Sequence, residues 1–216
     1  MAQPGVILPI LQNWSCHNCG GCCREHQIVI TADEKKCIDL QKWSAADGVV
    51  DDRPLIVAHG KDFRLNHQAD GACVFLDDRG LCRLHAKFGE AAKPLACRAY
   101  PYAVHPSGNS VTVSLRFSCP SVVQNLGQPL SQQRQSLEHL AREIVPSNYT
   151  APKPPWLGTI EQQITWPNVT TLLAFVERGL TVGKASFAIR LSRVVSWIDL
   201  LEQTPEEAIC GDQLGR

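Results

Sequence analysis

The residues of this sequence best suited to chemistry are its cysteines. There are ten in 216 residues, and nine of them lie between Cys16 and Cys119. The first group has the spacing Cys-x2-Cys-x2-Cys-Cys, formed by Cys16, Cys19, Cys22 and Cys23. Two-residue spacers let neighbouring thiolates turn inward toward one ion, as in zinc ribbons and iron–sulfur loops. We therefore interpret this group as metal ligands rather than as buried free thiols.

The adjacent pair Cys22-Cys23 is unusual for a single site. In an extended chain, successive side chains point to opposite sides. Either one of the two is not a ligand, or the two serve different metals. Gly20 and Gly21, which precede the pair, permit the backbone conformations that a metal-wrapping loop needs.

Further candidate ligands follow in the chain. Cys73 and Cys82 flank a polar turn, and a β-hairpin over residues 73–84 would bring them together across its strands. His85 has ligand spacing from Cys82, although a polar residue at the start of a short helix fits equally well. Cys97 lies between two prolines that restrict the local backbone.

Two other residues of this region, Arg98 and Cys119, are further candidates for the site. Arg98 is suited to neutralise a thiolate-ligated centre or to bind an anionic cofactor or substrate group, or it is a surface residue. Cys119-Pro120 resembles the dipeptide that closes ferredoxin-type cysteine runs.

The number of cysteines bears on the metal. Seven or eight thiolates exceed the ligands of one closed zinc site, which favours an iron–sulfur cluster over zinc. By contrast, Cys37 is expected to be a core thiol of a helix, and Cys210 lies far from the others.

Short elements are expected to position these residues. Thr31 and Glu34 form a possible capping box for a helix over about 32–46. Apolar periodicity predicts a helix through Leu137 and Ile144 behind a Ser131 cap. The other expected elements are a strand at 27–30, a half-buried strand through 111–117, helices from Pro167 and over about 184–201, and a further helix start at Thr204-Pro205-Glu206.

These elements predict an α+β fold. A small metal-nucleated, cysteine-rich domain with short strands spans residues 14–120. A helical extension over 121–216 packs on it and contains a proline-rich crossing segment at 146–155.

The charge composition excludes some classes of binding partner for this protein. Lys+Arg and Asp+Glu both number 21, so we expect no nucleic-acid partner and no membrane surface. No apolar run approaches the roughly 18 residues that span a bilayer. The N-terminus lacks basic residues before its apolar stretch, and prolines interrupt that stretch, which makes it a poor signal peptide. We therefore expect a cytoplasmic protein, in which clustered thiols stay reduced.

The ordered motifs resemble a known family. The motifs are Cys-x2-Cys-x2-Cys-Cys, Cys73-Val74-Phe75-Leu76, Cys82-Arg83-Leu84-His85 and Lys93-Pro94-x2-Cys97-Arg98-x-Tyr100-Pro101. Together, over residues 14–120, they resemble the CxxCxxCC family of zinc- or iron-chelating proteins, which includes flagellin lysine N-methylases. The resemblance implies a metal- or cluster-binding domain. It also implies a second hypothesis, a protein-lysine N-methyltransferase that uses S-adenosylmethionine and acts on a protein substrate.

A third hypothesis is a redox or electron-transfer module. The residues identify no catalytic base for methyl transfer. No glycine-rich strand-to-helix signature of a nucleotide fold is present, and the radical-SAM order Cys-x3-Cys-x2-Cys is not met.

Overall fold

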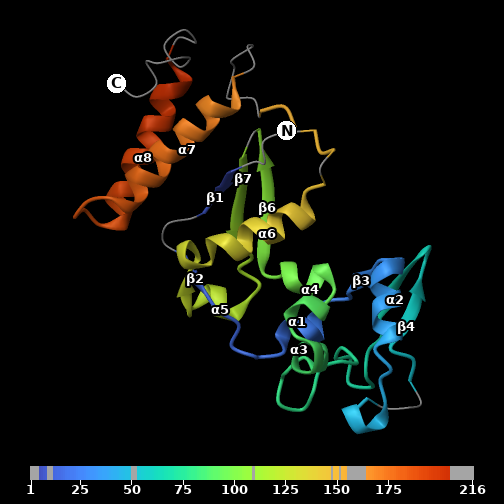
Figure 1. Ribbon diagram of the computed structural model, residues 1–216. Coiled ribbons are helices and arrows are strands. Elements are labelled where there is room, and N and C mark those ends of the chain that lie inside the picture. The colour runs from blue at the N-terminus through green and yellow to red at the C-terminus, as the bar shows by residue number, and fades with distance from the viewer. Residues whose placement is uncertain are drawn as a thin grey trace. The chain divides into compact units, whose positions relative to one another are not determined.

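The computed structural model describes residues 5–8, 12–49, 53–108, 110–146, 148–150, 152–154 and 164–204. The fold is α+β, as predicted, with helices and short strands in small sheets (Figure 1). The chain divides into two compact units. The larger comprises Pro4–His105 and Val111–Tyr149, and the smaller comprises Met1–Gln3, Pro106–Ser110 and Thr150–Arg216. The boundary predicted at residue 120 stays a prediction.

One antiparallel sheet of the larger unit has the order β3-β5-β4, formed by β3 (Val29–Ile30), β5 (Asp62–Leu65) and β4 (Ile56–His59). The predicted capping box is present before α2 (Ala32–Leu40). The backbone N–H of Glu34 donates to the Thr31 hydroxyl, and that of Thr31 donates to the Glu34 carboxylate.

This helix is shorter than the predicted 32–46. It ends at Leu40, and Lys42 adopts a left-handed conformation with φ 49°. Ser44 and Asp47 then form a capping box of their own around a 3-10 turn, η1 (Ala45–Asp47). That local start competes with continuation of the first helix.

The second sheet has the order β1-β7-β6, formed by β1 (Gly5–Ile7), β7 (Ser110–Leu115) and β6 (Tyr102–Ser107). In β7, Val111, Val113 and Leu115 are buried, as their alternation predicts, whereas Phe117 lies beyond the strand and is exposed. A separate pair joins β2 (Asn13–Trp14) to β8 (Gln128–Pro129).

Helix α6 (Arg134–Ile144) buries Leu137, Leu140 and Ala141 against the same core as β7. Its predicted Ser131 cap is wrong. Ser131 lies inside a 3-10 turn, η3 (Leu130–Gln133), and the helix starts only after Gln133, which makes no side-chain cap bond.

The predicted hairpin at 73–84 forms only next to its turn, where Leu76 and Cys82 make an antiparallel bridge. Residues 73–76 form a turn instead of a strand, because the backbone N–H of Leu76 donates to the carbonyl of Cys73 at 2.9 Å. Only isolated bridges remain, from His67 to Cys73 and from Leu76 to Cys82. The polar turn itself is present, since the Asp77 carboxylate accepts the backbone N–H groups of residues 79 and 81. The remaining short helices of this unit are α1 (Gly21–Glu25), α3 (Arg83–Phe88), η2 (Glu90–Ala92), α4 (Leu95–Ala99) and α5 (Pro120–Val123).

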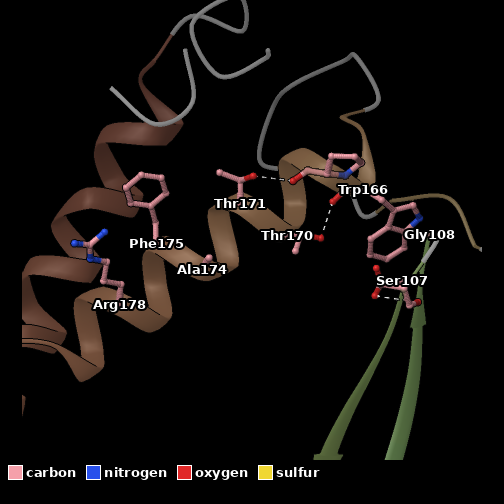
Figure 2. Close-up of a pocket in the computed structure, with 10 residues that line it drawn as sticks. Ser107, Gly108, Trp166, Thr170, Thr171, Ala174, Phe175 and Arg178 are labelled. Atoms are coloured by element: carbon pink, nitrogen blue, oxygen red, sulfur yellow. Dashed lines mark hydrogen bonds between the residues drawn. The ribbon is translucent and has the colours of Figure 1, made fainter. Parts of the chain in front are cut away.

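The smaller unit contains the two predicted late helices, α7 (Trp166–Thr181) and α8 (Phe187–Glu202), which lie side by side (Figure 1). The rings of Phe175 and Trp197 stack between them at 5.8 Å. Trp166, Phe175 and Arg178 of α7 line a shallow cavity of about 750 Å³ together with residues 107, 108 and 110 (Figure 2). No helix within the described residues has the length and apolar character needed to cross a membrane. The predicted helix start at 204–206 and Cys210 fall outside the described residues.

Candidate metal centre

A cavity of about 1030 Å³ in the larger unit collects the residues that the sequence singled out. Its lining includes every predicted ligand: Cys16, Cys19, Cys22, Cys23, Cys73, Cys82, His85, Cys97 and Cys119. These residues are up to 103 positions apart in the chain, so the fold gathers them. Their shared lining is the first observation in favour of a metal centre.

Cys22 and Cys23 lie in the helix α1, not in an extended segment. Gly20 enters this helix with φ 69°, a conformation that glycine adopts without strain. Consecutive residues of a helix are rotated by about 100° rather than 180°, and the two sulfurs lie 3.9 Å apart. Two thiolates on one tetrahedral zinc are separated by about 3.8 Å, given Zn–S bonds of about 2.3 Å. The expectation that the pair must point to opposite sides is therefore wrong.

Three further thiols adjoin this pair. The backbone N–H of Cys73 donates to the carbonyl of Cys23 at 2.7 Å, which ties the 73–76 turn to α1. Cys82 is the N-cap residue of α3, and Cys97 lies in α4. The charges of these thiolates interact with one another and with those of α1. We call Cys22, Cys23, Cys73, Cys82 and Cys97 the five-thiol cluster.

The protonation of the cluster is uneven. The Cys23 thiol donates a hydrogen bond to the Cys22 sulfur, and this bond, assisted by the charge of Lys93, lowers the pKa of Cys22 to about 6. The same hydrogen bond, together with burial, raises the pKa of Cys23. Burial raises the pKa of Cys73 to about 11 and that of Cys97 to about 12, and neighbouring thiolates add to both.

Burial is common to the raised values. Cys23, Cys73 and Cys97 are held away from water beside other thiols, so their thiolates form less readily in the metal-free protein. A cation bound among the sulfurs would remove that penalty, because thiolates rather than thiols are metal ligands.

The other predicted ligands lie at the margin of the cluster. Cys16, Cys19 and His85 are exposed, and the Cys16 thiol donates to the side-chain oxygen of Asn18 at 3.7 Å. Cys119 is buried among the side chains that pack between β7 and α6. The structure brings these four residues to the cavity wall, and their ligation stays a prediction.

Arg98 makes a bidentate ion pair with Glu143 of α6, with nitrogen–oxygen distances of 2.8 and 2.6 Å. Its Nε donates to the backbone carbonyl of Lys93. The carboxylate of Glu143 raises the pKa of Arg98, and Arg98 lowers that of Glu143. Arg98 therefore fastens α6 to α4 at the edge of the cavity. Its contact with a cofactor stays a prediction.

One predicted assignment outside the site is wrong. Cys37 was expected to be a core thiol, but its side chain is exposed on α2. Ile38 occupies the buried face of that helix instead. Ile38 is the one buried residue of this short helix, so apolar neighbours in the sequence do not place Cys37 on its buried face.

Two cavity residues that sequence reasoning passed over are His26 and Trp14. Their ring nitrogens, Nε2 and Nε1, are buried and have no hydrogen-bond partner. Buried polar atoms are nearly always paired, so two orphans on one cavity wall are what an additional bound group would leave. For His26 the signal was its position three residues after Cys23, but a lone histidine without paired spacing carried little weight.

The donor set thus fits a thiolate-bound metal, although the sulfurs surround the cavity rather than meeting at a point. Within the described part of the chain, no three Cys, His, Asp or Glu side chains already stand in the geometry of one ion.

Comparison with known proteins finds a family match over the same cysteine-rich segment. Residues 15–120 match the family model CxxCxxCC, described as "Putative zinc- or iron-chelating domain". Over 109 residues, or 49% of this chain, the sequence is 28% identical to a lysine-N-methylase of Salmonella choleraesuis and 27% identical to the flagellar biosynthetic protein FliU of Salmonella muenchen. The match covers 27% of the first relative and 64% of the second. No solved structure matches the chain.

Proposed function

We propose that this chain, whose residues 15–120 match the CxxCxxCC family, binds an iron–sulfur cluster or zinc in the cavity lined by the five-thiol cluster. One observation carries the proposal. Thiols from four separate segments of the chain line one cavity, and burial beside one another raises the pKa of Cys23, Cys73 and Cys97, an arrangement that a bound cation would stabilise in the thiolate form.

The number of sulfurs favours iron–sulfur over zinc. A closed zinc site takes four ligands, whereas the cluster holds five thiols. The same cavity is also lined by the other predicted ligands, Cys16, Cys19, Cys119 and His85. An iron–sulfur cluster would supply electron transfer, and zinc would supply a structural crosslink. In either case the chain's own part is to hold thiolates in a cavity whose lining includes Arg98, the residue that ties α4 to α6.

The test is elemental analysis and absorption spectroscopy of anaerobically purified protein. We expect iron with inorganic sulfide, and an absorption band that dithionite bleaches reversibly. Zinc with no visible band would select the other metal, and neither metal would refute the proposal. Cys73→Ser should lower the metal content, whereas Cys37→Ser, at an exposed thiol outside the cavity, should leave it unchanged.

A second candidate function is protein-lysine N-methylation with S-adenosylmethionine, acting on a protein substrate in the cytoplasm. It is favoured by the relative named lysine-N-methylase, which shares the cysteine-rich segment. The reaction needs a deprotonated lysine amine aligned with the sulfonium methyl group. Calorimetric titration of the metal-loaded protein with S-adenosylmethionine tests it. Absence of binding would remove this candidate and leave the metal site untouched.

A further inference from the structure

We propose that His26 is a positioning residue of the metal centre, which donates its Nε2–H to a metal-bound thiolate of the five-thiol cluster. The inference rests on the proposed metal binding and adds a residue that the cysteine pattern does not include. His26 is the C-cap residue of α1, and its backbone N–H donates to the carbonyl of Cys22 at 3.2 Å. Its side chain lines the same cavity as the cluster.

The ring nitrogen of His26 needs a partner that the protein does not provide. Nε2 is buried, and no hydrogen-bond partner for it exists among the described residues. An unpaired polar atom removed from water costs free energy, and native structures rarely retain one without a reason. A metal-bound sulfur in the cavity is an acceptor that would satisfy it.

The ring of His26 contacts the end of the helix that carries Cys97. Tyr100, the C-cap residue of α4, packs edge-on against His26 with ring centroids 4.9 Å apart and an interplanar angle of 61°. The Tyr100 hydroxyl is in turn hydrogen-bonded to the Ser118 hydroxyl at 3.2 Å. Tyr100 therefore links the ring of His26 to α4, the helix of Cys97, while the backbone of His26 closes α1, the helix of Cys22.

Charge explains why a donor is needed there. Lys93 interacts favourably with the thiolates of Cys22 and Cys97, but Arg98 is paired with Glu143. Hydrogen bonds to ligating sulfurs spread the negative charge of a thiolate-bound centre and tune its affinity and potential. A nitrogen ligand is not required, because five thiols already exceed the four ligands of a tetrahedral metal.

Three variants test the inference: His26→Leu removes the donor, His26→Gln retains an N–H donor, and His59→Leu is the matched control at an exposed histidine on β4. We expect His26→Leu to weaken zinc affinity 10- to 100-fold in competition with a chromophoric chelator, the usual cost of losing an outer partner of a metal ligand. His26→Gln should recover most of the affinity, and His59→Leu should match the wild type. In an iron–sulfur form, His26→Leu should lower the reduction potential, because the lost donor stabilises the more negative, reduced cluster. Each tenfold shift of the one-electron equilibrium toward the oxidised cluster corresponds to about 59 mV.

A measurement on the wild type guards against a variant that fails to fold. Nitrogen NMR of the zinc-loaded protein should show His26 protonated at Nε2. Wild-type affinity in His26→Leu, equal loss in the Gln and Leu variants, or a His26 Nε2 that is bound to zinc would each overturn the inference while metal binding stands. A wild-type protein that binds neither metal would overturn both.

Discussion

Replacing Gly80 with alanine should disturb the candidate metal centre from outside its ligand set. Gly80 has φ 79°, and a Cβ placed on it would lie 2.5 Å from the backbone carbonyl oxygen of Asn18. Asn18 sits between Cys16 and Cys19, so the turn after Asp77 packs directly on the first cysteine loop. Real Cβ contacts do not fall below 3.0 Å, so one of the two backbones must move by about half an ångström.

Gly71 is the matched control for this change. It has a similar φ of 84°, but a Cβ there would meet nothing within 4 Å. Gly71→Ala should therefore cost only the left-handed strain, about 1–2 kcal/mol. Gly80→Ala carries the same strain plus a backbone clash of the size found for overpacked sites, about 1–3 kcal/mol. We expect a total loss of about 2–5 kcal/mol in the free energy of unfolding.

Urea unfolding of both variants under anaerobic conditions measures this difference. Hydrogen exchange should place the added loss of protection of Gly80→Ala in residues 15–25, and its metal content should fall with it. Equal unfolding free energies for the two variants would refute the reasoning. They would mean that the close approach of the two loops exerts no constraint.

Three other predictions concern the cluster and its edge. Cys97→Ser should reduce hydrogen-exchange protection across residues 14–120 far more than Cys37→Ser, because metal binding at a cluster thiol is itself folding free energy; equal protection in both would show that the metal is an addition to an independently stable fold. In metal-free protein, alkylation of Cys22 followed by mass spectrometry should rise with a midpoint near pH 6, set by its lowered pKa, and a midpoint above pH 8 would contradict the hydrogen-bonded pair. Glu143→Gln should cost about 1 kcal/mol or less at pH 7, since the pair with Arg98 is partly exposed. Because Arg98 lowers the pKa of Glu143 below 4.5, the wild type alone should lose this stability as the pH falls below about 4.5, and parallel curves of unfolding free energy against pH would refute it.

The sequence was most informative where chemistry and local rules coincide. The capping box at Thr31, the buried alternation in β7 and the periodicity of α6 all follow from neighbouring residues, and the structure contains each of them. The cysteine spacing also predicted a gathering of thiols, because no packing rule alone accounts for four cysteines within eight residues.

The sequence was least informative where contacts between distant segments determine the local conformation or the pairing of side chains. Nothing local indicates that residues 73–76 close into a turn against α1, or that Cys82 starts a helix instead of continuing a strand. The pairing of Arg98 with Glu143 joins positions 45 residues apart. His26 shows its role only through a missing hydrogen-bond partner, which requires a structure to observe.

The spread of the five-thiol cluster along the chain has a consequence for biosynthesis. Its first and last members, Cys22 and Cys97, are 75 positions apart. Translation proceeds at about 5–20 residues per second, so the last thiol follows the first by about 4–15 s. Glu143, which fastens α6 to the helix of Cys97, comes later still. For that interval the early thiols emerge from the ribosome without their later partners, so the cluster is completed only after most of the larger unit has been made.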